Sequence, residues 1–403
     1  MGPLRIALNH TRLAAGGGVE GYILNLLRHL LDAGHSVDYF CGKVSLEMAH
    51  PRLRIVRVPY LRAPRLLRVA SFALLSHRAI AREERAKPYD VVQGFSRTYY
   101  HTLYRDGSGC RQDYRELYLD PVNRRGLRRL YYKLDPIDAV VRRIERRRFV
   151  TMPQKVVIAN SRFVRDQILR RYAVAPESVR IIYSGVDCDR FRPDLRGAGR
   201  AKLDGIFGEP GGGTGRRYLT FVGNDYERKG LDLIFQALLR FVEPPAGCPD
   251  FRLVVAGADP RTARYERAAR EMGLSSRAAF LGRRSDVPEI LAGSDALLLP
   301  SYFDAYANVG NEALACGTPV IVSPTTGNAE LIGADNGWVL AKNDAEELRR
   351  ALEGFFAVQD LSSHREGARR AALELSWGNH YRKIDEVLEE FAAKREESDG
   401  AAG

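Results

Sequence analysis

Residues 300–319 read PSYFDAYANVGNEALACGTP, and this segment carries two carboxylates eight positions apart. Asp304 stands before a run of small residues, and Glu312 lies inside the helix that this run predicts. Gly317 ends the helix, and the residues after it indicate a strand. The amino end of such a helix offers N–H groups to a phosphate, and a carboxylate one turn further in accepts hydrogen bonds from sugar hydroxyls. The segment therefore predicts a nucleotide-sugar site.

Strand and helix patterns alternate along both halves of the chain, which predicts two parallel sheets covered by helices. A chain of 403 residues is long enough for two domains with separate cores. The predicted strands are 4–9, 35–41, 53–59, 90–95, 218–223, 251–256, 279–281, 296–299 and 319–322. The predicted helices are 19–31, 66–85, 230–241, 263–272, 287–292, 308–316 and 376–395. The glycines of 196–217 predict a mobile surface segment.

Further motifs occur in a fixed order around the acidic pair. They are IIYSGVDCDRFRP at 181–193, FVG at 221–223, RKG at 228–230, LGR at 281–283 and SDALLLPS at 294–301. Their order and spacing resemble family 4 of the retaining glycosyltransferases, most of all the lipopolysaccharide core glucosyltransferase I type. Asp304 replaces the usual first Glu of that family. The resemblance covers nearly the whole chain.

The resemblance implies the α/β fold named GT-B, in which two Rossmann-like domains face a cleft and the last helix crosses back to the first domain. The acceptor domain would comprise 1–183, completed by 376–397, and the nucleotide-sugar donor domain 184–375. The implied reaction moves a hexose, glucose first, from a UDP-sugar to a phosphorylated or lipid-linked glycan of the lipopolysaccharide core or a related cell-surface glycan. Alternatives are a mannosyl- or other hexosyltransferase of exopolysaccharide or glycolipid assembly and a GT-B nucleotide-sugar epimerase. A basic membrane- or nucleic-acid-binding protein with a degenerate cleft is the alternative outside enzymes.

The resemblance also assigns roles on the donor side. Asp304 would contact the transferred sugar and Glu312 the ribose. Lys229 is the implied phosphate lysine, and Arg228 beside it would stabilise the departing diphosphate, because fixed cations favour developing negative charge. The family often places an Arg directly after the glycine, where this chain has Asn224. The remaining implied donor contacts are Gly223, Tyr306, Ala307, Asn308 and Val309.

Two segments of the first half are implied to lie near the substrates. Gly17 and Gly18 follow the first strand and open a helix, where glycines allow close approach and the helix start favours anions. Residues 104–110 resemble an acceptor-side segment, in which Arg105 would contact the acceptor and Asp106 would act as acceptor contact or base. His101 is an alternative base. For Asp106 and His101 a structural role stays open.

The chain carries a net charge of +12, and much of the excess lies in a basic arm at 124–148. Apolar residues interleave with its arginines, which fits an anionic membrane surface or a phosphorylated glycan. The alternative is a solvated helix. No nucleic-acid-binding motif supports a nucleic-acid partner. The residues expected to meet acceptor or membrane are Arg124, Arg125, Arg128 and Arg129.

Neither composition nor spacing indicates a metal or a membrane span. Asp187 and Asp189 mimic a metal-binding motif, but they lie in the implied interdomain turn, so no metal and no cofactor is expected. No apolar run approaches the ~18–20 residues of a transmembrane helix. The five scattered cysteines suit a reducing compartment. We therefore expect a cytoplasmic enzyme associated peripherally with the inner face of the cytoplasmic membrane.

Overall fold

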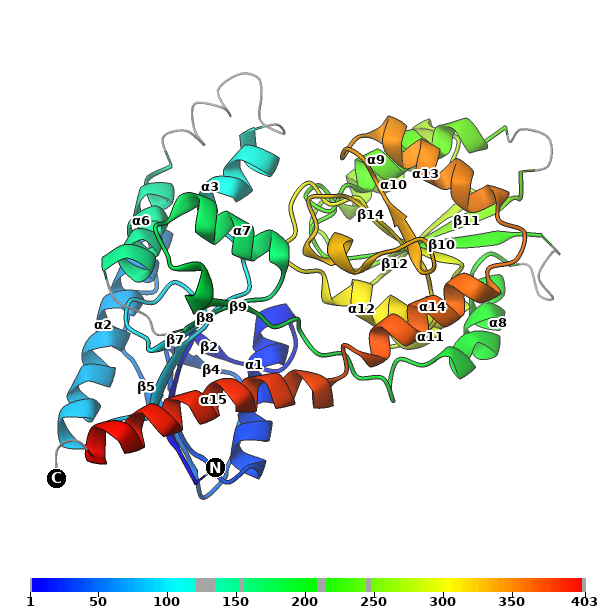
Figure 1. Ribbon diagram of the computed structural model, residues 1–403. Helices are drawn as coiled ribbons and strands as arrows, with labels where there is room; N and C mark the ends of the chain where they lie inside the picture. The colour runs from blue at the N-terminus through cyan, green and yellow to red at the C-terminus, as the bar shows by residue number, and fades with distance from the viewer. Residues whose placement is uncertain (1, 121–134, 152–155, 209–214, 244–247, 401–403) are drawn as a thin grey trace. The chain divides into compact units, whose positions relative to one another are not determined.

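The computed structural model describes residues 2–120, 135–151, 156–208, 215–243 and 248–400. The chain divides into two compact units (Figure 1). Unit 1 comprises Met1–Ser184 with Gly378–Gly403, and unit 2 comprises Gly185–Trp377. Each unit is built on a parallel sheet covered by helices, so the predicted fold class of two parallel α/β domains is confirmed.

Unit 1 contains a parallel sheet in the order β5-β3-β1-β6-β7-β8-β9. Its strands are β1 (Arg5–Asn9), β3 (Ser36–Cys41), β5 (Leu53–Arg57), β6 (Val91–Gly94), β7 (Leu103–Asp106), β8 (Val156–Ala159) and β9 (Val179–Ile181). The short strands β2 (Arg12–Leu13) and β4 (Lys43–Val44) pair separately. Its helices are α1 (Gly18–Asp32), α2 (Arg65–Ala86), α3 (Arg111–Tyr114), α6 (Pro136–Arg146), α7 (Arg162–Arg171) and α15 (Trp377–Gly400).

The last helix belongs to unit 1 although it is distant from it in sequence. The apolar stripe of α15 is buried, including Ile384 and Leu388. His29 Nε2 and Asp385 Oδ1 lie 2.8 Å apart, and the rings of His29 and Tyr381 stack at 4.1 Å. The helix is drawn in red beside the unit 1 sheet in Figure 1. Burial of the stripe and this polar pair hold α15 on unit 1.

Unit 2 contains a second parallel sheet, in the order β12-β11-β10-β13-β14-β15. The strands are β10 (Arg217–Val222), β11 (Phe251–Ala256), β12 (Ala278–Gly282), β13 (Ala296–Leu299), β14 (Val320–Val322) and β15 (Gly337–Val339). The helices are α8 (Arg196–Ile206), α9 (Leu231–Leu238), α10 (Thr262–Glu271), α11 (Val287–Gly293), α12 (Asn308–Ala315), α13 (Ala345–Ala357) and α14 (Ser362–Leu373). Buried apolar residues of β10, β11, β13 and α9 form its main core, as their continuous apolar runs predict.

The prediction of a mobile surface segment at 196–217 is wrong for its first half, residues 196–206. Residues Arg196–Ile206 form helix α8, which packs against α11, and Leu203 is fully buried. Gly199 is the reason, because it lets the backbones of α8 and α11 approach closely. A Cβ on Gly199 would lie 2.0 Å from the carbonyl oxygen of Glu289. Glycine here serves close packing rather than flexibility.

Among the described helices, none is long and apolar enough to cross a membrane.

Candidate active site

The candidate site in unit 2 lies at the carboxyl ends of β10 and β13. The sheet grows from β10 in one direction through β11 and β12, and in the other through β13 to β15. The connections therefore leave neighbouring strands β10 and β13 in opposite directions, and open α/β sheets bind ligands at such a switch point. The loop after β10 carries the basic pair Arg228 and Lys229, and the loop and helix α12 after β13 carry the acidic pair Asp304 and Glu312.

Gly223 lets the side chain of Lys229 cross the end of β10. A Cβ at this position would lie 2.2 Å from Lys229 Cδ, so the lysine side chain occupies the space that only glycine leaves open. Gly230 follows with φ 76°, a conformation that favours glycine, and a Cβ there would meet the carbonyl oxygen of Pro300 at 2.1 Å. Gly230 thus brings the loop after β10 against the loop after β13.

Asp304 lies between the two cations predicted to act with it. Its Oδ2 is 3.0 Å from Lys229 Nζ and 3.4 Å from Arg228 Nη1. Burial alone would raise the pKa of Asp304, but the charges of Lys229 and Arg228 outweigh it and lower the pKa to about 2. Hydrogen bonds from Asp304 N to Thr325 O and from Gly327 N to Asp304 O fix the backbone. Asp304 is therefore ionised at neutral pH.

Glu312 lies one turn further into α12 and has a different environment. Burial raises the pKa of Glu312 to about 7, although the charges of Arg190 and Lys229 lower it. Arg190 lies in the turn after Asp187, within the 181–193 motif, but it was not predicted as a site residue. A carboxyl that titrates near neutral pH beside two cations is typical of a functional site. Asp304, Lys229, Arg228 and Glu312 thus form one electrostatic cluster.

A buried amide network holds the loop before α12. Asn328 Oδ1 accepts the N–H of Ala307 at 2.7 Å, and Asn328 Nδ2 donates to Asn311 Oδ1 at 3.0 Å. The Tyr306 hydroxyl also bonds to Asn311, at 2.8 and 3.0 Å. The Ala307 N–H, predicted to lie near the diphosphate, is therefore used inside the protein. Of the residues predicted there, Asn308 and Val309 begin α12.

Arg228 is positioned by three acceptors. Its Nε bonds Asp225 Oδ2 at 3.0 Å, and its Nη1 bonds Phe303 O at 2.7 Å besides approaching Asp304. Asn224, which stands where the family often has Arg, accepts the N–H of Ala258 at 3.0 Å and ties this loop to the one after β11. Arg228 and Lys229 are therefore the two cations that contact Asp304 here.

In unit 1 the glycine-rich loop has the predicted local form. Gly17 has φ 87° and is the residue before α1, which Gly18 begins. A Cβ on Gly17 would lie 2.8 Å from Glu20 Oε2. The loop follows β1 and β2 and leads into the amino end of a fifteen-residue helix, so its N–H groups and dipole suit an anion.

The acceptor-side residues predicted in unit 1 are deeply buried. Arg105 is 3% exposed, donates to Ser184 Oγ at 2.8 Å and lies 3.6 Å from the Tyr22 ring centroid. Asp106 Oδ1 accepts the N–H groups of Ser108 and Gly109, each at 3.0 Å. Arg105 is thus packed on an aromatic ring, with its Nε left without a hydrogen-bond partner among the described residues, and Asp106 Oδ1 holds the turn that follows β7.

The two histidines near this edge differ in their partners. His101, the alternative base, is 2% exposed and its Nε2 lies 2.7 Å from Thr98 Oγ1. His10, which sequence reasoning missed, follows β1 and is 5% exposed. Neither ring nitrogen of His10 has a hydrogen-bond partner among the described residues, and burial lowers its pKa to about 4. A neutral, unpartnered imidazole can still exchange hydrogen bonds with a substrate.

The described part of the basic arm is helix α6 and the turn after it. Ile137, Val141 and Ile144 are buried, so the apolar stripe of α6 packs within unit 1. Arg148 is also buried, with its guanidinium 3.9 Å from the Tyr104 ring centroid. The described part of the arm therefore presents exposed arginines, while the apolar stripe of α6 is not at its surface. Arg124, Arg125, Arg128 and Arg129 lie outside the described residues.

Asp187 holds a turn. Its Oδ1 accepts the N–H groups of Asp189 at 3.2 Å and Arg190 at 2.9 Å. Within the described ranges, no group of three or more His, Cys, Asp or Glu side chains is arranged to hold a metal ion.

Two family models match the chain. The model described as glycosyl transferases group 1 matches residues 206–372, and the model described as glycosyltransferase family 4 matches residues 16–190. A protein of Burkholderia thailandensis named probable transglycosylase is 30% identical over 352 residues, which cover 87% of this chain and 86% of that protein. The D-inositol 3-phosphate glycosyltransferase of Saccharomonospora viridis is 28% identical over 55% of this chain and 52% of its own length.

Solved glycosyltransferase structures share the fold over almost the whole chain. WaaG, a glycosyltransferase involved in lipopolysaccharide biosynthesis, aligns with a TM-score of 0.74 and 23% identity over 95% of this chain and 99% of its own. HepE of Anabaena in complex with UDP-glucose aligns with a TM-score of 0.67 and 17% identity over 96% of this chain and all of its own, 100%.

Proposed function

The chain belongs to the group 1 glycosyltransferases, and we propose that it is a retaining hexosyltransferase that uses a nucleotide-sugar donor. The observation that carries the proposal is the cluster at the carboxyl ends of β10 and β13. There an ionised Asp304 contacts Lys229 and Arg228, and Glu312 follows on the same loop and helix. The cluster contains cations for a diphosphate and carboxylates for hydroxyl groups.

Each group has a role in the proposed reaction. Lys229 and Arg228 bind the diphosphate and stabilise the charge that it gains when the bond to the sugar breaks. Asp304 accepts hydrogen bonds from the transferred hexose, and its negative charge favours the positive charge that develops at the anomeric carbon. Glu312 accepts hydrogen bonds from the ribose. These cations take the place of a divalent metal, so the reaction needs neither a metal nor a resident cofactor.

The retaining course is proposed from the family resemblance. The acceptor hydroxyl attacks the anomeric carbon from the face that the diphosphate leaves. A departing phosphate oxygen accepts the proton of that hydroxyl, so the new glycosidic bond forms as the sugar–phosphate bond breaks.

UDP-glucose is the proposed donor, and a phosphorylated or lipid-linked glycan of the lipopolysaccharide core type is the proposed acceptor. Support comes from the motifs, from the neighbour that binds UDP-glucose and from the neighbour involved in lipopolysaccharide biosynthesis. The exposed arginines of the basic arm, Arg142, Arg143, Arg146 and Arg147, support peripheral attachment to the anionic inner face of the cytoplasmic membrane.

A donor screen tests the proposal. The purified protein is titrated with UDP, GDP and ADP and with their hexose conjugates, with and without chelator, and slow donor hydrolysis is followed. Lys229→Met should weaken diphosphate binding and abolish hydrolysis, whereas Lys342→Met removes the same charge from an exposed position and should change neither. Binding that disappears in chelator, or hydrolysis that survives Lys229→Met, would contradict the proposed site.

A further inference from the structure

Unit 2 contains an arginine-lined pocket at the amino ends of its strands. Its volume is about 400 Å³. The lining includes Arg217 at the start of β10, Asp295 directly before β13, and Arg196 and Arg200 on α8. The remaining lining residues are Gly215, Arg216, Pro249, Phe356 and Gln359. The proposed donor cluster lies at the carboxyl ends of the same strands, so the length of β10 separates the two, about 20 Å.

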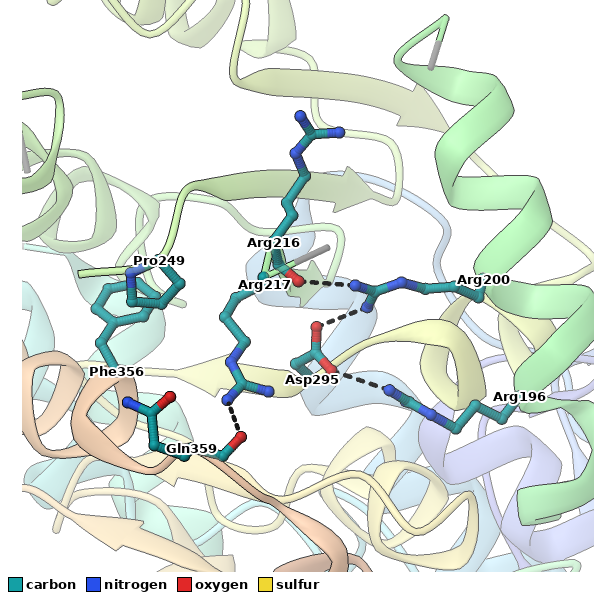
Figure 2. Close-up of a pocket in the computed structure, with 9 residues that line it drawn as sticks. Arg196, Arg200, Arg216, Arg217, Pro249, Asp295, Phe356 and Gln359 are labelled. Carbon is teal, nitrogen blue, oxygen red and sulfur yellow. Dashed lines mark hydrogen bonds and ion pairs between the residues drawn. The ribbon is translucent and has the colours of Figure 1, made fainter. Parts of the chain in front are cut away.

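One buried carboxylate, that of Asp295, forms ion pairs with several guanidinium groups at this pocket. Asp295 is 1% exposed, and Arg200 Nη1 and Arg196 Nη2 lie 2.7 and 3.1 Å from its oxygens. Arg365 Nη2 adds a third contact at 2.7 Å. Figure 2 shows Arg196 and Arg200 meeting the carboxylate from one side of the pocket. Burial and the charges of Arg196, Arg200 and Arg217 lower the pKa of Arg365 to about 10, against the effect of Asp295, so the cations here are crowded.

The other two lining arginines, Arg216 and Arg217, pair with no carboxylate that lines the pocket. Arg217 Nη2 donates to the backbone oxygens of Val358 at 2.7 Å and Gln359 at 2.9 Å. Arg216 pairs with Asp250, which also contacts Arg252 and Arg277. Asp360 lies near enough to act on Arg217 electrostatically, but its Oδ1 accepts the backbone N–H of Ser362. Four arginines and a single carboxylate therefore line the pocket, and an added anion would relieve the excess of positive charge.

The opposite wall is suited to the organic part of a ligand. Pro249 and Phe356 lie together there, beside Gln359 (Figure 2). The volume falls within the ~300–1,000 Å³ of small-molecule sites. It also far exceeds the ~30 Å³ share of a single water, so a bare phosphate would leave most of the pocket to solvent.

We propose that this pocket binds a phosphate monoester of a small hydroxylated molecule. The phosphate lies among Arg196, Arg200 and Arg217, because planar guanidinium groups match phosphate oxygens in pairs. The carbon skeleton rests against Pro249 and Phe356, and Gln359 can bond a hydroxyl. Since the pocket is at the opposite strand ends from Lys229 and Asp304, its ligand and the nucleotide sugar bind without competing.

Calorimetric titration of the full-length protein with inorganic phosphate, sulfate, glucose 6-phosphate and glycerol 3-phosphate, at constant ionic strength, tests the proposal. A parallel flotation assay uses phosphatidylcholine vesicles with and without phosphatidic acid, so that a soluble ester and a lipid headgroup are distinguished. The double variant Arg200→Gln/Arg217→Gln should weaken ester binding at least tenfold. The matched control Arg349→Gln/Arg350→Gln removes the same charge from the exposed side of α13 and should bind as the wild type does.

Each outcome of these experiments either supports or overturns the proposal. Ester binding lost only in the pocket variant, and undiminished by saturating UDP, supports the proposal for a soluble ligand. The same variant effect on phosphatidic acid vesicles alone supports it for a lipid headgroup. No binding of any phosphate monoester, equal binding of sulfate and esters, or equal losses in both variants would overturn it. If the double variant does not fold, hydrogen exchange of the wild type decides: the ester must slow exchange around 196–200 and 356–360 rather than around 223–230.

Discussion

The environment of Glu312 makes donor binding depend on pH in a predictable direction. Burial raises the pKa of Glu312 to about 7 in the ligand-free protein. Ribose hydroxyls bind best to the ionised form, which accepts hydrogen bonds. With this pKa, about 10% of the protein carries an ionised Glu312 at pH 6 and about 90% at pH 8, so the apparent affinity for the nucleoside should rise about ninefold between them. Asp304, with a pKa of about 2, stays ionised throughout and adds no pH dependence.

The assay compares the wild type with Glu312→Gln. Titration with uridine and UDP from pH 6 to 8 gives the dissociation constant at each pH, and uridine is included because its ribose has no phosphate that titrates in this range. The variant keeps the shape of the side chain but cannot ionise, so its uridine affinity should not change with pH. If wild type and variant give parallel profiles, or if wild-type affinity rises as the pH falls, the assignment of Glu312 to the ribose is wrong.

Three further predictions follow from single contacts. Asp304→Ala should lower turnover about 10²–10³-fold while UDP affinity holds or improves, because the cations lose their internal partner; single-turnover kinetics and calorimetry separate the two effects. Gly223→Ala should weaken UDP binding, because its Cβ would lie 2.2 Å from the lysine chain, whereas Gly205→Ala, with no atom within 4 Å, should not. Gly199→Ala should lower the free energy of unfolding by about 1–3 kcal/mol, and urea titration should find no such loss for Gly197→Ala, which meets open space.

The sequence predicted the strands that carry the unit 2 site because their apolar runs are buried on both faces. Strands β11 and β13 begin and end where the pattern placed them. The contact of Asp304 with Lys229 follows from topology, since neighbouring parallel strands end at the same edge of the sheet. Sequence motifs that place Lys229 after β10 and Asp304 after β13 therefore also predict that these two side chains lie close together.

Residue type alone could not predict how polar groups are used. Asp106 was a candidate base, yet its Oδ1 holds a turn. The Ala307 N–H was expected near a phosphate, but Asn328, which is 21 positions away, accepts it. His10 was missed because a lone histidine after a strand carries no pattern. In each case a partner distant in sequence, or the lack of one, decides the role.

The net charge of the chain does not show where its arginines lie. A net charge of +12 indicated polyanionic partners at the surface. In the structure several arginines are drawn inward: Arg105 and Arg148 are buried against aromatic rings, and Arg196 and Arg200 share Asp295. Inward arginines contribute little to long-range attraction, because they are partly neutralised and fixed. They instead preorganise positive charge at defined points of the fold, and such points favour small phosphorylated ligands over an extended polyanion.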